Sequence, residues 1–99
     1  MKNGFSVFIT PAGERSYKKL PTRVVRFVER DLIALLEKNP HRGEPLAPPL
    51  QPLRSFHFSQ DGQPYRVAYA LNESERKVSI YFIGHRRDFY ERLRRLLGR

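Results

Sequence analysis

The stretch SFHFSQDGQPYRVAYALNESERKVSIYFI (residues 55–83) decides the fold that this sequence predicts. Three runs within it are rich in aromatic and β-branched residues and alternate in polarity, which is typical of strands with one face against a core. The runs lie at 55–59, 65–71 and 77–83. Turn signals separate them: Asp61-Gly62 follows the first run, and residues 72–76 follow the second. The stretch therefore predicts three antiparallel strands joined by two turns.

Upstream of these strands the sequence predicts one further strand and two helices. Residues 5–10 have the same strand composition. Thr10-Pro11 pairs an N-capping residue with a proline at the first helical position, so a short helix is expected to about Lys19. Pro21 opens a second helix in the same way, and Asn39-Pro40 ends it. The buried stripe of this second helix comprises Val24, Val25, Val28, Leu32, Leu35 and Leu36.

Two further segments complete the predicted fold. Residues 40–52 hold five of the eight prolines and predict a stiff, extended connection. Residues 88–97 predict a short basic helix whose leucines form an apolar edge, and such an edge docks on the protein's own sheet, on a partner or on a membrane surface. The prediction is a small α+β domain of residues 1–99, ordered β-α-α-β-β-β-α, with its helices packed on an antiparallel sheet.

The chain is strongly basic. Its 99 residues include 19 Lys and Arg against 10 Asp and Glu, which gives a formal net charge of +9. This charge indicates a polyanionic partner: nucleic acid, an acidic protein or an anionic membrane surface. Arginine supplies 14 of the 19 basic residues, and its planar fork binds phosphate in a bidentate way. The alternative explanation is a GC-rich genome, which raises the arginine content of every protein.

Several chemistries lack the residues they need. The sequence has no cysteine, so neither disulfides nor a cysteine-ligated metal are available. Its histidines, His41, His57 and His85, do not have metal-ligand spacing, and no glycine-rich nucleotide-binding motif is present, so no cofactor is expected. No apolar run has the length of a membrane span, and the first residues lack the apolar core of a leader peptide. We therefore expect a cytoplasmic protein.

Strand alternation sorts the side chains of the predicted sheet onto two faces. One face takes the large apolar residues and packs against the helices: Phe56, Phe58, Val67, Tyr69, Leu71, Val78, Ile80 and Phe82. The other, open face gathers Ser55, His57, Arg66 and Tyr81, with His85 one pleat further on. Beyond the last strand, Arg86 and Tyr90 are four residues apart, and they share one face of the C-terminal helix if that helix begins by Arg86.

This set of two imidazoles, two guanidiniums and a phenol suits RNA cleavage without a metal ion. A base takes the proton of the ribose 2′-OH, which attacks the adjacent phosphate, while guanidiniums stabilise the charge that develops and an acid protonates the leaving 5′-oxygen. Histidine titrates in the range that either proton transfer needs. On spacing alone, solvated surface histidines and a Tyr90 ring that only packs are the alternatives.

The element order and two motifs resemble the RelE/ParE superfamily of bacterial toxins. The motifs are Tyr65-Arg66-Val67-Ala68-Tyr69 and Ile83-Gly84-His85-Arg86-Arg87-Asp88-Phe89-Tyr90. The segment from Leu46 to Ser55 is similar to the family's linker into its second strand, so the resemblance covers nearly the whole chain. It implies the toxin of a type II toxin–antitoxin system. For RelE-type members it implies a ribosome-dependent endoribonuclease that cuts the mRNA codon in the A site.

The resemblance also implies roles for individual residues. Arg66 is expected to hold the scissile phosphate, and Arg86 to stabilise the transition state or aid protonation of the leaving group. Tyr90 is expected to orient the nucleotide or to stack on a base. Further contacts with RNA are expected from Arg54, Ser55, Arg87, Arg94 and Arg95.

One position departs from the family pattern and leaves alternatives open. The best-studied RelE form has a pair of lysines on the second strand, where this sequence has Ser55 and His57, so cleavage needs His57 or His85 as the base. ParE-type relatives share the fold but poison DNA gyrase, and a third possibility is a basic member that binds RNA or the ribosome without cutting. The partners expected of a RelE-type toxin are an acidic antitoxin, the ribosome and mRNA. The antitoxin would cover the basic face or displace the C-terminal helix.

Overall fold

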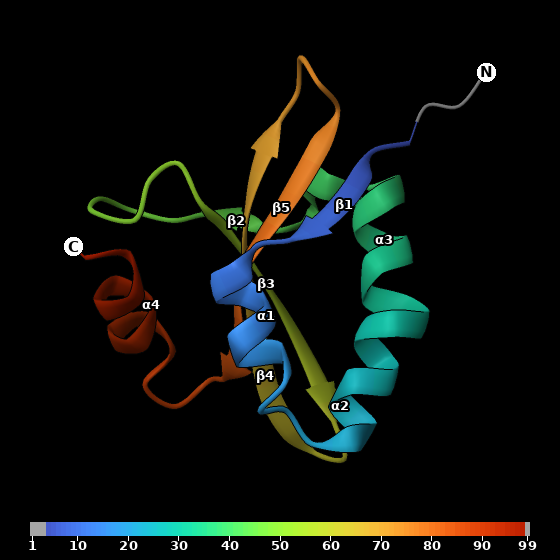
Figure 1. Ribbon diagram of the computed structural model, residues 1–99, viewed down its shortest axis with the longest axis vertical. Helices are drawn as coiled ribbons and strands as arrows, with labels where there is room; N and C mark the ends of the chain where they lie inside the picture. Colours follow the sequence, from blue (N-terminus) through green and yellow to red (C-terminus); the bar gives the residue numbers. More distant parts are fainter. Residues whose placement is uncertain (1–3, 99) are drawn as a thin grey trace.

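The computed structural model describes residues 4–98, which fold around a five-stranded sheet of order β1-β5-β4-β3-β2 (Figure 1). The strands are β1 (Ser6–Ile9), β2 (Glu44–Pro45), β3 (Arg54–Gln60), β4 (Gln63–Asn72) and β5 (Lys77–His85). The helices are α1 (Pro11–Tyr17), α2 (Thr22–Phe27), the π-helical η1 (Val28–Leu32), α3 (Ile33–Lys38), the 3-10 turn η2 (Pro40–Arg42) and α4 (Phe89–Leu97). The predicted α+β order is confirmed. The sheet is mixed, however, because β1 runs parallel to β5.

Strand β1 pairs with β5 only as far as Ile9, and beyond it the N-cap and side chains of α1 form hydrogen bonds with the backbone of β5. The Thr10 hydroxyl accepts a hydrogen bond from the Gly13 amide and donates one to the Ile80 carbonyl, both at 3.0 Å. The buried Ser16 hydroxyl accepts from the Ile83 amide at 3.1 Å and donates to the Gly13 carbonyl at 2.7 Å. A side chain at Gly13 would collide with the Ile80 carbonyl, so glycine lets α1 lie directly against the strand. These bonds pair backbone groups of β5 that would otherwise be left at an open edge.

The rod formed by α2, η1 and α3 covers one face of the sheet. Helical dihedral angles continue through both junctions of η1, so residues 22–38 form one unbroken helix. Its buried stripe of Val24, Val28, Leu32 and Leu36 is the predicted one, except that Val25 and Leu35 are only half-buried. This stripe packs on the strand residues Phe58, Tyr65, Val67, Tyr69, Val78, Ile80 and Ile83.

A β-bulge in β5 changes which side chains face each way. Ala68 pairs with Phe82, and the next residue of β4, Tyr69, pairs with Ile80, so Tyr81 is an extra residue. Alternation restarts after the bulge. Phe82 therefore leaves the α2–α3 face, and the prediction that placed it there is wrong.

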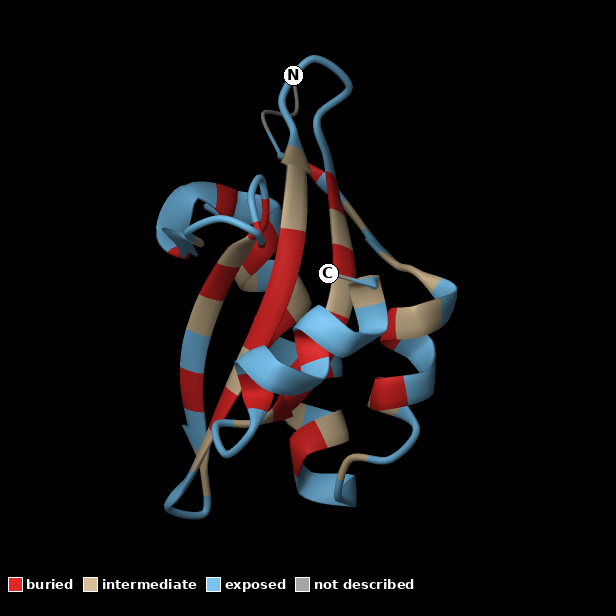
Figure 2. Cartoon of the chain, turned by 90° about the vertical axis from the view of Figure 1, so that its left-hand side faces the viewer, coloured by how far each residue is buried: buried red, intermediate tan, exposed pale blue. Residues whose placement is uncertain are grey.

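The opposite face of the sheet carries a second, smaller core. Phe82 packs there with Leu50, Leu53, Ala68, Phe89 and Leu93. Helix α4 lies over this face, with its outer side exposed to solvent (Figure 2). Its apolar edge thus docks on the protein's own sheet, and the open face of the sequence-based prediction is partly covered.

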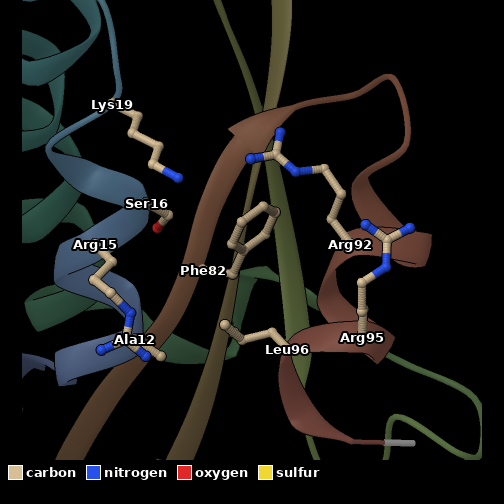
Figure 3. Close-up of a pocket in the computed structure, with 8 residues that line it drawn as sticks. All are labelled: Ala12, Arg15, Ser16, Lys19, Phe82, Arg92, Arg95 and Leu96. Atoms are coloured by element: carbon tan, nitrogen blue, oxygen red, sulfur yellow. The ribbon is translucent and has the colours of Figure 1, made fainter.

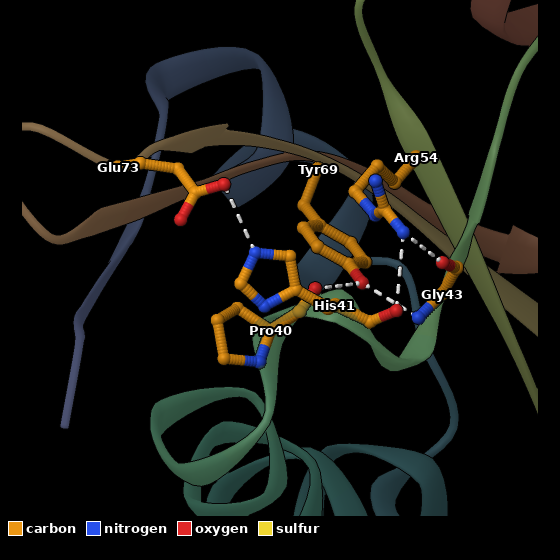
Figure 4. A network of polar contacts seen from close by, with 6 residues as sticks. All are labelled: Pro40, His41, Gly43, Arg54, Tyr69 and Glu73. Carbon is orange, nitrogen blue, oxygen red and sulfur yellow. Dashed lines mark hydrogen bonds and ion pairs between the residues drawn. The ribbon is translucent and has the colours of Figure 1, made fainter. Parts of the chain in front are cut away.

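A network of polar contacts ties the start of the proline-rich segment to the sheet (Figure 4). The hydroxyl of the fully buried Tyr69 donates to the Pro40 carbonyl at 2.6 Å and accepts from the Gly43 amide at 2.9 Å. Arg54 donates to the carbonyls of His41 (3.1 Å) and Gly43 (2.7 Å). These bonds fix the point at which the chain turns toward β2.

Candidate active site

His57 on β3 and Arg66 on β4 stand opposite each other in the strand register, as the sequence predicts. The Nη1 atom of Arg66 lies 2.8 Å from Nε2 of His57. The same Nη1 atom donates a hydrogen bond to the Tyr90 hydroxyl on α4. The Arg66 guanidinium carbon also lies 5.0 Å from the centre of the Tyr90 ring. The Arg66 guanidinium on β4 thus contacts both His57 on β3 and Tyr90 on α4.

The contact with arginine assigns the tautomer of His57. A guanidinium only donates hydrogen bonds, so Nε2 of His57 must supply the lone pair and the ring proton resides on Nδ1. His57 is exposed and Arg66 is half-buried. The pair therefore presents a neutral imidazole beside a fixed positive charge at the protein surface.

Arg86 is a second arginine at this place. It directly follows β5, and its amide donates to the Pro64 carbonyl at 2.9 Å. With His57, Arg66 and the β3–β4 backbone it lines a cleft of about 190 Å³. Two guanidiniums beside one imidazole in a shallow cleft suit the binding of a phosphate with a proton acceptor at its side.

His85 does not join this cluster. It pairs with Tyr65, whose ring packs in the α2–α3 core, and the two ring centres are 5.5 Å apart. Its Nε2 lies 3.0 Å from Gln63 Oε1, and its Nδ1 accepts from the Arg87 amide at 3.0 Å. The extra residue in β5 turns His85 to the face opposite His57, so its predicted place on the open face is wrong.

The predicted RNA-contacting residues do not form one surface. Ser55 faces the right way but is 2 % exposed. Arg54 faces the other side of the sheet and is bonded to backbone carbonyls. Arg87 lines a cleft with His85, Gln63, Asp88 and Arg92, and Arg95 lines one beside α1. Of this set, only Arg94 is exposed on the same wall as Tyr90.

A hollow beside Tyr90 was missed by the sequence analysis. The proline-rich residues 45–50 and one side of α4 enclose a cleft of about 410 Å³, with Tyr90, Glu91 and Arg94 along the helix wall. The spacing of Tyr90 and Arg94 places them one turn apart, but nothing in the sequence shows that the proline-rich segment lies against them. The cleft extends the candidate site away from the His57–Arg66 pair.

Two general features of the described chain bear on the site. Among residues 4–98, no group of three or more His, Cys, Asp or Glu side chains could hold a metal ion. No helix within the same range is both long and apolar enough to cross a lipid bilayer.

The match to a family model covers this whole arrangement. Residues 7–94 match the model described as the ParE-like toxin of type II bacterial toxin–antitoxin systems. The chain belongs to the RelE/ParE family of type II toxins. It is 32% identical over 87 residues to the toxin RelE of Mycobacterium tuberculosis, a match that spans 87% of this chain and 86% of that protein. The resemblance seen in the sequence is thereby confirmed.

Solved structures of this toxin family share the fold. The RelBE2 toxin–antitoxin complex of M. tuberculosis matches with a TM-score of 0.71 and 27% identity, over 84% of this chain and 92% of that chain. A double arginine-to-alanine mutant of E. coli toxin RelE in the free state matches with a TM-score of 0.67 over 91% of this chain and 90% of that chain. Its identity of 11% shows a shared fold only.

Proposed function

We propose that this toxin is a ribosome-dependent endoribonuclease that cleaves mRNA in the A site. The observation that carries the proposal is the contact of His57 with Arg66, in a cleft that Arg86 also lines and that Tyr90 borders. Its relative in M. tuberculosis bears the name toxin RelE, which agrees with this activity. Ribosomes and mRNA as partners also imply a cytoplasmic protein.

The reaction starts when the scissile phosphate enters between Arg66 and Arg86. The phosphate is a stronger acceptor than an imidazole, so it draws the Arg66 guanidinium away and frees the lone pair on Nε2 of His57. His57 then takes the proton of the ribose 2′-OH as the 2′-oxygen attacks phosphorus. The bond from phosphorus to the 5′-oxygen breaks, which leaves a 2′,3′-cyclic phosphate on one fragment. Both guanidiniums stabilise the extra negative charge of the transition state.

The leaving 5′-oxygen needs a proton, and Tyr90 is placed to supply it. The Tyr90 oxygen accepts its hydrogen bond from Arg66, so its own O–H proton is not used in that contact. The ring is 39% exposed, which leaves surface for a nucleobase to stack on.

The net charge of +9 supports the proposed partners. It attracts the phosphate chains of the ribosome and mRNA, and it equally attracts an acidic antitoxin. Solved relatives include toxin–antitoxin complexes, so we propose an acidic antitoxin protein as the partner that holds this toxin inactive.

Primer extension on programmed ribosomes tests the activity. Purified protein added to ribosomes with a defined mRNA should give cuts in the A-site codon, and naked mRNA should stay intact. Arg66→Ala should abolish the cuts. Arg26→Ala is the matched control, because Arg26 is an exposed arginine on α2, far from β4 in sequence and outside the cleft of the candidate site. Cuts of equal strength with both variants would refute the site.

A second candidate function follows from the description of the family model, which is ParE-like. ParE-type activity would act on DNA gyrase and would not need the His57–Arg66 pair. A DNA supercoiling assay with gyrase therefore separates the two functions: inhibition of gyrase by both wild type and Arg66→Ala, with no cut in mRNA, would favour gyrase poisoning.

A further inference from the structure

A further cleft lies on another side of α4, and none of its residues takes part in the proposed cleavage of mRNA. Its walls are α1 and α4, its volume is about 250 Å³, and it lies over Phe82 of β5 (Figure 3). Tyr90 is not among its lining residues. We call this hollow the α1–α4 cleft.

The rim of the α1–α4 cleft is positively charged on both walls. Arg15 and Lys19 come from the α1 side, and Arg92 and Arg95 come from α4. Lys19 and Arg92 extend from opposite walls toward the gap above Phe82 (Figure 3). Within the described range 4–98, none of these four cations has a carboxylate within 4.0 Å. The cations repel one another, and a partner that brings carboxylates would relieve that repulsion.

The floor of the cleft is apolar. Phe82 is 4% exposed, and Leu96, at the lower end of the cleft, is 37% exposed although it is a large aliphatic side chain. The Arg92 guanidinium lies over the Phe82 ring, 5.0 Å from its centre. Arg92 therefore blocks the stacking of a nucleobase on this face of the Phe82 ring, whereas an aliphatic side chain can still pack against Leu96.

Charged walls above an apolar floor at which Leu96 is exposed fit an amphipathic acidic peptide better than an RNA backbone. The phosphates of RNA would satisfy the cations but would bring no aliphatic group to Leu96. A segment in which leucine alternates with glutamate or aspartate satisfies both features. Carboxylates would meet the two walls, and a leucine would cover the floor.

We infer that the α1–α4 cleft is a docking site for an acidic, leucine-bearing segment of the antitoxin, which bridges α1 and α4. This inference rests on the proposed antitoxin partner and is independent of the proposed cleavage. Because α4 supplies one wall of the cleft, the bound segment holds α4 on the sheet, with Phe89 and Leu93 still buried beneath it. Docking here therefore excludes displacement of α4 by the same segment.

Binding of a synthetic peptide of alternating glutamate and leucine tests the inference. Fluorescence anisotropy of a labelled peptide measures affinity, and backbone amide NMR shows where it binds. We expect shifts at Ala12, Phe82 and Leu96, and a loss of at least about tenfold in affinity when glutamine replaces glutamate in the peptide. Amide hydrogen exchange in α4 should slow on binding. Faster exchange in α4 would overturn the inference, because a displaced α4 removes one wall.

Charge-reversed variants supply the matched comparison. Arg15→Glu with Arg92→Glu should weaken peptide binding by at least about tenfold, and Lys19→Glu with Arg95→Glu is a second pair that leaves the Arg92–Phe82 contact intact. Arg26→Glu with Arg30→Glu changes the net charge equally, on exposed positions of the α2–η1 rod, and should change affinity by less than about threefold. Equal losses in all pairs would overturn the site. So would shifts at the cleft with oligouridine RNA and none with the peptide.

The peptide-binding and mRNA-cleavage experiments test the two hypotheses independently of each other. A protein that binds the peptide at the α1–α4 cleft but leaves ribosome-bound mRNA intact would keep this inference and refute the endoribonuclease. The reverse result would refute the docking site alone.

Discussion

His57 and Arg66 stand opposite each other on β3 and β4, and the Nε2 atom of His57 accepts a hydrogen bond from Arg66 across 2.8 Å. Through this contact the imidazole offers its Nε2 lone pair to a guanidinium, which can only donate. In the proposed mechanism, phosphate binding to Arg66 would loosen this contact and free the lone pair of His57.

Replacement of the two histidines should have unequal effects. His57→Gln should reduce the rate of mRNA cleavage by about 10²–10⁴-fold and flatten the acidic limb of the pH–rate profile, because no group then takes the 2′-OH proton. His85→Gln should leave rate and profile close to wild type, because His85 faces the other side of the sheet. Single-turnover cleavage on programmed ribosomes measures both. Loss of activity only in His85→Gln would contradict the assignment of the base.

Removal of either arginine of the cleft should slow the chemical step. Arg66→Ala and Arg86→Ala should each lower the rate by about 10²–10³-fold, since each removes one charge from the transition state. Arg66→Lys should recover only part of the loss, because an ammonium does not reproduce the two-pronged contact with phosphate. Thermal melting serves as the control for folding. Wild-type rates in both alanine variants would remove these residues from the mechanism.

Two substitutions at Tyr90 separate its hydroxyl from its ring. Tyr90→Phe keeps the exposed ring but has no proton to give, so the rate should fall by about 10²-fold. Tyr90→Ala also loses the stacking surface, and the Michaelis constant for ribosome-bound mRNA should rise as well. A Tyr90→Phe variant as fast as wild type would show that the ring acts alone and that another group protonates the 5′-oxygen.

Tyr17 should titrate unusually late in alkali. Burial, together with its hydrogen bond to Glu29 at 2.7 Å, raises the pKa of Tyr17 from 10.0 to about 12. The fold therefore favours the neutral phenol, and this contribution to stability is complete below pH 10 and lost as the pH rises toward about 12. Ultraviolet absorbance titration of wild type and Tyr17→Phe measures the shift. Glu29→Gln should bring the pKa of Tyr17 back toward 10.0, and an unchanged titration would contradict this cause.

The buried Tyr69 hydroxyl should matter for stability rather than for cleavage. Tyr69→Phe leaves the Gly43 amide and the Pro40 carbonyl without their partner and should lower the free energy of unfolding by about 1–3 kcal/mol. Urea denaturation measures the loss. Residual activity per folded molecule should match wild type, because Tyr69 lies in the α2–α3 core and not in the cleft with His57.

The sequence allowed the fold and half of the site to be predicted, because those parts depend on local rules. The turn at Asp61-Gly62 sets the register of β3 against β4, and that register puts His57 opposite Arg66. Arg86 and Tyr90 both lie near the pair, as predicted, although α4 begins only at Phe89 and the two residues therefore do not share a helix face. The short β3–β4 hairpin determines the places of His57 and Arg66 without help from the rest of the chain.

The predicted side-chain positions are wrong where packing between segments distant in the sequence determines the structure. The bulge at Tyr81 has no glycine or other local signal, and it sends Phe82 and His85 to the faces opposite the predicted ones. Ser55 has a surface residue's chemistry but is 2 % exposed, and its partner on β4, Ala68, belongs to the smaller core. Arg54 was predicted to contact RNA, but its guanidinium binds carbonyls of residues 41 and 43, which only the folded chain brings near.

The extra residue in β5 also has a consequence for how members of this toxin family are compared. A homologue of equal length in which the residue corresponding to Tyr81 pairs regularly, without a bulge, would present its next residues to the opposite faces, although its motif around Gly84 and Arg86 would still align without a gap. Two toxins that both carry a histidine at position 85 would then place it on different surfaces. Whether β5 contains this bulge, rather than the motif itself, decides to which face of the sheet that histidine points.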